Sequence, residues 1–137
     1  MQASKLMKYA TGLFYVVGGP LIHAYLIANQ RGIYAAVDDQ AWPPYQTLWT
    51  HLVLPHLVPL VMLLVCFEIG AGALMLNKRQ VWAELGQLGG LFFNLLLLPF
   101  WFAYGIPNLV LVLVHGRLFQ QERHAQNAQA VAKLVHV

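Results

Sequence analysis

The fold is decided by the stretch from His56 to Leu76, which reads HLVPLVMLLVCFEIGAGALML. Within it only Glu68 carries a formal charge. An α-helix rises about 1.5 Å per residue, so a run of this length can cross a hydrocarbon core about 30 Å thick. An acid inside such a run costs roughly 2.5 kcal/mol or more unless it faces protein or water. The stretch therefore predicts a membrane-spanning helix that packs against other helices around a polar point.

The composition of the whole chain is typical of membrane proteins. Of 137 residues, 59% are apolar and only 9% are charged, whereas a soluble domain carries about 25% charged residues. Basic residues do not cluster beside aromatic ones, so we expect no nucleic-acid partner. The single cysteine, Cys66, excludes an internal disulfide.

Four apolar segments predict an all-α, integral-membrane four-helix bundle. We expect one transmembrane domain over residues 1–119, with spans at about 6–28, 49–76, 81–104 and 106–119, followed by a cytoplasmic helical tail at 120–137. Proline should distort these helices, because it removes a backbone donor. We expect a distortion at Gly18-Gly19-Pro20, a break near Pro55 and Pro59, and a bend or end at Pro99. The fourth span should begin at Ile106-Pro107, with its proline in the first turn.

The basic residues predict the orientation. On one side of a four-span bundle lie Lys5, Lys8, Lys78, Arg79, Arg117, Arg123 and Lys133, and on the other lies only Arg31, accompanied by Asp38 and Asp39. The positive-inside rule then places both termini in the cytoplasm. The expected location is a bacterial-type inner (plasma) membrane.

Residues 66–79, CFEIGAGALMLNKR, lead into a glycine-rich third span, and residues 9–23 read YATGLFYVVGGPLIH. Both stretches resemble the DoxX-like family of small four-helix membrane proteins. That resemblance implies the architecture and association with membrane redox complexes, such as those of thiosulfate:quinone oxidation. It implies no catalytic residues. The chain departs from the family in its long Pro-Pro first loop and its C-terminal extension.

Polar residues inside the spans are the candidate ligand-binding residues. Counted from the basic ends, Glu68 lies roughly 15 Å inward and Gln87 roughly 12 Å, so the two can meet if their helices pack directly. His23 and Asn94 both lie roughly 22 Å inward. Interhelical hydrogen bonding that holds the bundle together is one interpretation, and a ligand-facing site is the other.

Three further features complete the prediction. Gly86, Gly90 and Asn94 recur every four residues, so they share one stripe that should lie against another helix. Haem or pigment could be bound through His23 or His56, and the three histidines His23, His51 and His56 towards one face suggest a metal or haem site. However, His51 and His56 are five residues apart, a spacing that does not bring them together on a helix. His115, close to Arg117, is expected at the membrane interface.

These observations favour an accessory or structural subunit of a membrane complex, potentially redox and quinone-linked. Its expected partners are the lipid bilayer, other membrane subunits, and a quinone or lipid ligand. One alternative is a small membrane enzyme that acts on a lipid or quinone through Glu68 and His23. The other is a haem- or pigment-binding subunit. No nucleophile–base pair, phosphate loop or dinucleotide-binding motif is recognised in the sequence, so neither a reaction nor a cofactor can be assigned.

Overall fold

The computed structural model describes residues 2–36, 41–99 and 102–135, and their regular elements are all helices. The first long segment joins α1 (Gln2–Leu13), the π-helix η1 (Phe14–Gly18) and α2 (Gly19–Asn29). Three more long helices follow: α5 (Leu57–Met75), α6 (Gln80–Leu96) and α7 (Phe102–Val135). The short helices α3 (Gly32–Ala36), α4 (Pro43–Leu48) and η3 (Trp49–Val53) lie between α2 and α5. The predicted all-α fold is confirmed.

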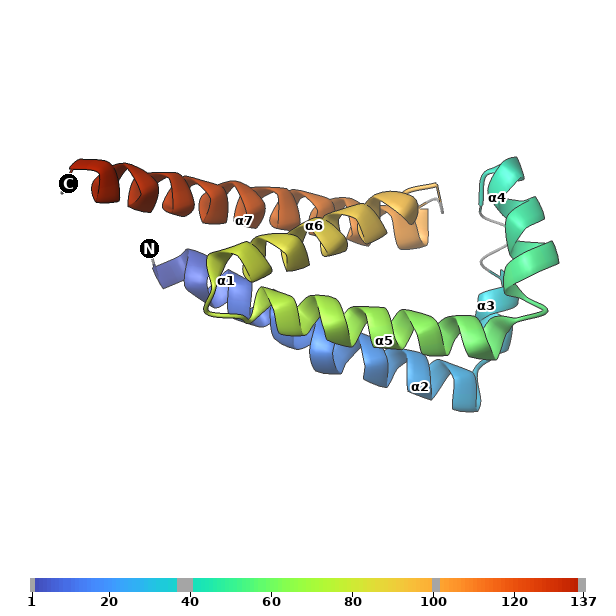
Figure 1. Ribbon diagram of the computed structural model, residues 1–137. Helices are drawn as coiled ribbons and strands as arrows, with labels where there is room; N and C mark the ends of the chain where they lie inside the picture. The colour runs from blue at the N-terminus through green and yellow to red at the C-terminus, as the bar shows by residue number, and fades with distance from the viewer. Residues whose placement is uncertain (1, 37–40, 100–101, 136–137) are drawn as a thin grey trace.

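The four long segments run alternately up and down (Figure 1). Both chain ends and the turn between α5 and α6 lie towards one end of the molecule, and α3 and α4 lie towards the other. At the first end the Lys8 ammonium donates to Glu122 Oε1 at 2.7 Å, which ties α1 to α7. At the second end Trp42 N–H donates to the Pro99 carbonyl at 3.3 Å, so the connection before α5 reaches the turn after α6.

Proline shapes the helices mostly as expected. Just before Pro20 the helix widens into η1, where the Gly19 N–H bonds to the Phe14 carbonyl five residues back. The second span is broken, with turn residues 54–56 between η3 and α5. The third helix ends at Leu96, shortly before Pro99 and well short of the expected 104.

The expected start of the fourth helix is wrong. It already begins at Phe102, so Pro107 lies inside α7 rather than in its first turn. Turn residues 97–99 follow α6 directly, and α7 already begins at Phe102, five residues before the proline. The same helix continues without a break to Val135, so the predicted tail is part of α7. Asp38 and Asp39 lie outside the described residues.

Glycines let the helices approach one another closely. A Cβ added to Gly86 would lie 2.6 Å from the Met75 nitrogen on α5, and one added to Gly90 would lie 2.5 Å from His115 Cε1 on α7. A Cβ added to Gly72 would likewise lie 2.7 Å from the Gly12 carbonyl oxygen on α1. The prediction that Gly86 and Gly90 face other helices is confirmed, and α6 is packed between α5 and α7.

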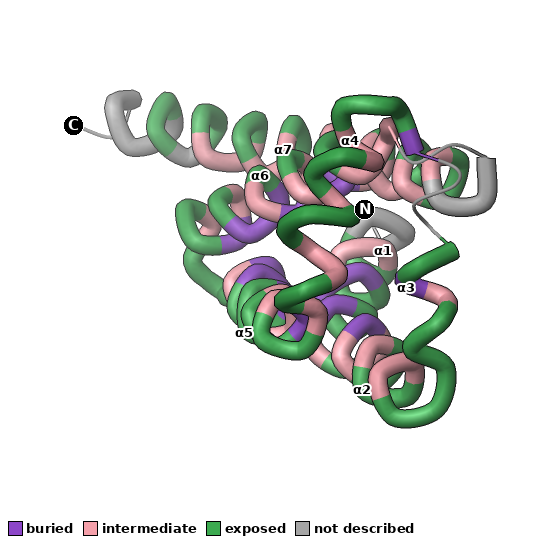
Figure 2. Tube along the Cα trace, turned by 90° about the vertical axis from the view of Figure 1, so that its right-hand side faces the viewer, coloured by how far each residue is buried: buried purple, intermediate pink, exposed green. Residues whose placement is uncertain are grey.

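Among the described residues, polar side chains are buried together with apolar ones such as Val61, Met75 and Leu118, while many large apolar side chains are exposed. Buried polar side chains are Thr11, Glu68, Gln87, Asn94 and His115, whereas Leu21, Leu63 and Leu113 are each about two-thirds exposed. In Figure 2 buried segments alternate with exposed and intermediate ones along the described helices. Two helical segments, Lys5–Asn29 and Leu57–Met75, are long and apolar enough to cross a membrane, and only 22% of the apolar window of each is buried.

Candidate functional site

A buried polar cluster, here called the central network, joins three helices. Asn94 Nδ2 on α6 donates to the Tyr15 hydroxyl on η1 at 2.6 Å and to the Gly90 carbonyl at 2.7 Å. On α7, His115 Nε2 lies 3.2 Å from the same hydroxyl. The other ring nitrogen, His115 Nδ1, lies 2.7 Å from Gln87 Oε1. Asn94, Gln87 and His115 are almost completely buried.

The donor and acceptor roles in the central network are fixed by its two side-chain amides, Asn94 and Gln87. The Asn94 amide can only donate through Nδ2, so the Tyr15 oxygen accepts and its own proton is free to go to His115 Nε2. Gln87 Oε1 can only accept, which requires a proton on His115 Nδ1. The arrangement therefore fits a neutral imidazole and satisfies both of its nitrogens. A chain of this kind fixes the rotation of three helices about their axes.

A second cluster, here called the Glu68 cluster, lies where α5 meets α2 and α3. Glu68 Oε1 is 3.5 Å from His23 Nε2, and His23 Nδ1 is 2.8 Å from the Tyr34 hydroxyl. The carboxyl group occupies the space that the missing side chain of Gly19 leaves, because a Cβ there would lie 2.6–2.7 Å from its atoms. Trp49 Nε1 donates to the Tyr34 carbonyl at 2.7 Å, which holds α3 over His23.

Among the described residues, the Glu68 cluster leaves a carboxylate oxygen unpaired and its histidine partly exposed, whereas in the central network the unpaired atom is the amide nitrogen Nε2 of the buried Gln87. Glu68 Oε2 is buried and has no hydrogen-bond partner among the described residues. The His23 side chain is 19% exposed. Burial, and secondarily the charge of Glu68, raise the pKa of the Tyr34 phenol above its ordinary value of 10.0. The three side chains form a line from Tyr34 through His23 to a carboxylate that has an acceptor to spare, so the cluster can bind a hydroxyl or amine donor.

The structure divides the predicted site residues between these two clusters. It brings Glu68 and His23 together, and it places Gln87 and Asn94 in the central network. Gln87 bonds to His115 rather than to Glu68. His56 is exposed in the turn before α5 and belongs to neither cluster.

The expectation that His115 lies at the membrane interface is wrong, because its side chain is completely buried. The sequence did contain a signal for its true depth. Counted from Arg123 instead of Arg117, His115 lies eight residues inward, as Gln87 does from Arg79. Tyr15 and Tyr34 were also missed as members of the clusters. No spacing rule links Tyr34 to His23, because α3 must first fold back over α2.

Both ring nitrogens of His23 already face a partner, so an axial haem or pigment ligand would have to displace Glu68 or Tyr34. Across residues 2–36, 41–99 and 102–135, no three His, Cys, Asp or Glu side chains gather as a metal site would require. Comparison with known proteins adds no relative: no family model, no curated protein and no solved structure matches this chain.

Proposed function

We propose that the chain is a four-span inner-membrane protein with both termini in the cytoplasm, and that it serves as an accessory subunit of a membrane complex. The observation that carries the proposal is the large number of exposed apolar side chains in the described part of the chain, among them Leu21, Leu63 and Leu113, combined with buried polar groups such as Gln87 and Asn94. In water such a surface would aggregate, whereas in lipid it is the stable arrangement.

Helix lengths and charges support the same proposal. Besides the two segments long and apolar enough to cross a membrane, α6 has 17 residues, the lower end of the range that spans a bilayer. Seven of the eight Lys and Arg residues belong to the end that holds both termini, as the positive-inside rule requires of a cytoplasmic face. The likeness of residues 66–79 to the DoxX-like family supports a redox, quinone-linked complex.

Reporter fusions test the topology. A reporter fused after Val137 should be active in the cytoplasm, and one inserted at Asp38-Asp39 should be active on the opposite side. An external C-terminal reporter would contradict the proposed span count or orientation.

Extraction of native membranes tests the role as an accessory subunit. In a mild detergent the chain should migrate on a native gel in an assembly larger than itself, with the same redox subunit in every preparation. Migration as a lone chain in all mild detergents would contradict this role and leave the membrane topology standing.

The Glu68 cluster supports a second candidate, a small membrane enzyme that acts on a lipid or quinone through Glu68 and His23. Glu68 Oε2 is buried without a hydrogen-bond partner in the described part of the chain, so a ligand hydroxyl can donate to it. A soluble short-chain quinol titrated into the purified chain should then shift the imidazole NMR signals of His23, and Glu68→Gln should weaken binding. Unchanged His23 signals at saturating quinol would rule out a quinone substrate at this cluster, and the same titration with a short-chain lipid tests the lipid.

A further inference from the structure

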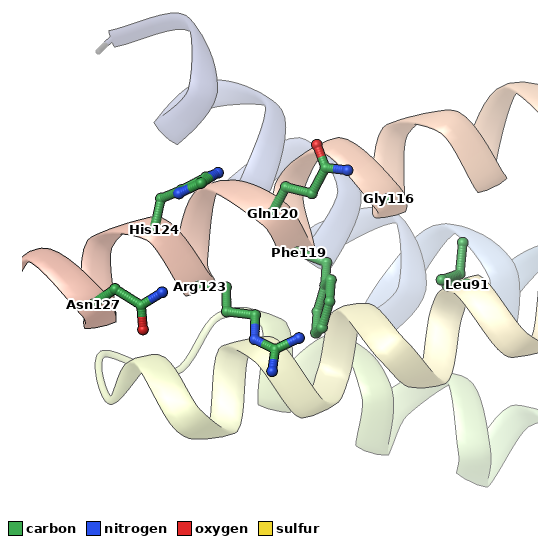
Figure 3. Close-up of a pocket in the computed structure, with 7 residues that line it drawn as sticks. All are labelled: Leu91, Gly116, Phe119, Gln120, Arg123, His124 and Asn127. Carbon is green, nitrogen blue, oxygen red and sulfur yellow. The ribbon is translucent and has the colours of Figure 1, made fainter.

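A pocket of about 400 Å³ lies between α6 and α7, outside both polar clusters (Figure 3). Its lining residues are Leu91, Gly116, Phe119, Gln120, Arg123, His124 and Asn127. In Figure 3 Arg123 and Phe119 extend from α7 towards α6, while His124 and Asn127 lie nearer the C-terminal part of α7 and Leu91 lies at the far end. The pocket is therefore apolar at one end and basic and amide-rich at the other.

The hydrogen bond between Gln87 and His115 gives the depth of this pocket. The two helices are antiparallel, so seven residues back along α6 to Gln80 match seven residues forward along α7 to Glu122. Arg123 is therefore level with the start of α6. Leu91 lies eleven residues inside that start, or roughly 16 Å deeper. The polar end of the pocket is at the proposed membrane surface, and its apolar end is at the depth of acyl chains.

Arg123 is available to an anion. It is exposed, and its guanidinium lies 5.8 Å from the centre of the Phe119 ring. The ion pairs in the described part of the chain are Lys8–Glu122 and His23–Glu68, so no described carboxylate neutralises Arg123. The planar fork of arginine suits two phosphate oxygens. Asn127 lies one helical turn beyond Arg123 on the same face and can donate a further hydrogen bond, whereas Gln120 and His124 point to the other side of α7 in Figure 3.

We propose that this pocket binds an anionic phospholipid, with its phosphate at Arg123 and an acyl chain over Phe119 and Gly116. The inference rests on the membrane orientation proposed above, since the cytoplasmic leaflet carries the anionic lipids that attract basic residues. A free phosphate ion would use only the basic end, and the apolar end at Leu91 and Gly116 would then have no occupant.

Native mass spectrometry of the full chain in detergent micelles, titrated with phosphatidylglycerol or phosphatidylcholine, tests the proposal. The chain should retain phosphatidylglycerol in preference to phosphatidylcholine. Arg123→Gln should weaken phosphatidylglycerol binding about fivefold, the effect of one basic residue near the surface. Arg117→Gln is the matched control, because Arg117 is exposed on the same helix and does not line the pocket.

A second variant tests the apolar end. A Cβ at Gly116 would meet nothing within 4 Å, so Gly116→Leu should fold and should fill the acyl-chain space. It should lower phosphatidylglycerol retention while Arg123 is intact.

Three results would overturn the proposal: equal losses in the Arg123 and Arg117 variants, equal retention of both lipids, or displacement of phosphatidylglycerol by millimolar inorganic phosphate. In each case the membrane topology stands if the chain still sediments with membranes. Recovery of the chain in the soluble fraction would instead contradict the topology itself.

Discussion

Tyr15 is the residue at which the contacts of the interior converge. Its hydroxyl bonds to Asn94 and His115, its ring meets His115 edge-on at 5.3 Å, and its side chain packs with Ala71 and Met75. It therefore links the first helical segment to three others. The hydroxyl is the one oxygen in the central network that both accepts and donates.

Tyr15→Phe should destabilise the bundle by about 1–3 kcal/mol, because the Asn94 amide and the His115 ring each lose a buried partner. Tyr9→Phe is the control, since Tyr9 is 53% exposed. Thermal melting in detergent measures both. Equal melting temperatures for the two variants would mean that the hydroxyl of Tyr15 contributes nothing to stability.

Two substitutions of Glu68 distinguish whether its side chain has a structural or a chemical role. Glu68→Gln keeps the shape and an acceptor for His23, whereas Glu68→Leu leaves His23 Nε2 without a partner. We expect near-normal melting for the Gln variant and a loss of roughly 1–3 kcal/mol for the Leu variant. If the Gln variant folds normally and yet loses ligand binding or turnover, the carboxylate acts on a ligand. Similar melting of both variants would show that the contact with His23 adds no stability.

The raised pKa of Tyr34 predicts that folding stability falls at alkaline pH. Because folding raises the pKa of its phenol, Tyr34 contributes stability below about pH 10 that is lost as the pH rises through its folded pKa. Ultraviolet absorption is titrated against pH for the wild type and for Tyr34→Phe. The difference between the two curves should show a phenol that ionises above the ordinary pKa of tyrosine. In Glu68→Gln this pKa should fall only partly, since burial is the larger cause. An ordinary pKa in the wild type would contradict the packing of α3.

At the scale of elements, α6 depends on glycines placed where other helices touch it. Gly89 and Gly90 are neighbours with opposite surroundings. A Cβ at Gly89 would make ordinary contact with Phe67, at 3.8 Å, whereas one at Gly90 would overlap the His115 ring and approach Met75 Cε to 2.9 Å. Alanine substitutions at Gly89 and Gly90 therefore distinguish the effect of helix propensity from the effect of packing.

Gly89→Ala should be neutral or slightly stabilising, because alanine favours a helix over glycine by roughly 0.5–1 kcal/mol. Gly90→Ala should instead cost about 1–3 kcal/mol, since the His115 ring cannot move without breaking its bonds to Gln87 and Tyr15. Chemical unfolding in detergent compares the two. A stabilised Gly90 variant would mean that α6 and α7 lie further apart than the structure has them.

At the scale of the whole molecule, the sequence predicted the helices better than their partners. Apolar runs and prolines gave the long segments and the break before α5, because both depend on local chemistry. Partners inside the bundle also depend on the rotation of each helix about its axis, which depth alone does not give. Depth alone therefore allows Gln87 to meet Glu68, whereas in the structure Gln87 bonds to His115. Tyr34 could not be placed, because the fold of its connection depends on the distant Trp49.

Tyr15 and His115 are 100 residues apart in the chain, and the bond between them has a consequence for biosynthesis. When the ribosome has released α1 to α6, Gln87 Oε1 still lacks the donor that α7 brings. Until α7 packs against α6, the Gln87 Oε1 acceptor lacks the donor that His115 provides in the folded chain. The contacts between α6 and α7 therefore form late in synthesis, and a chain stopped before residue 115 would leave Gly90 and Gln87 without the helix that packs against them.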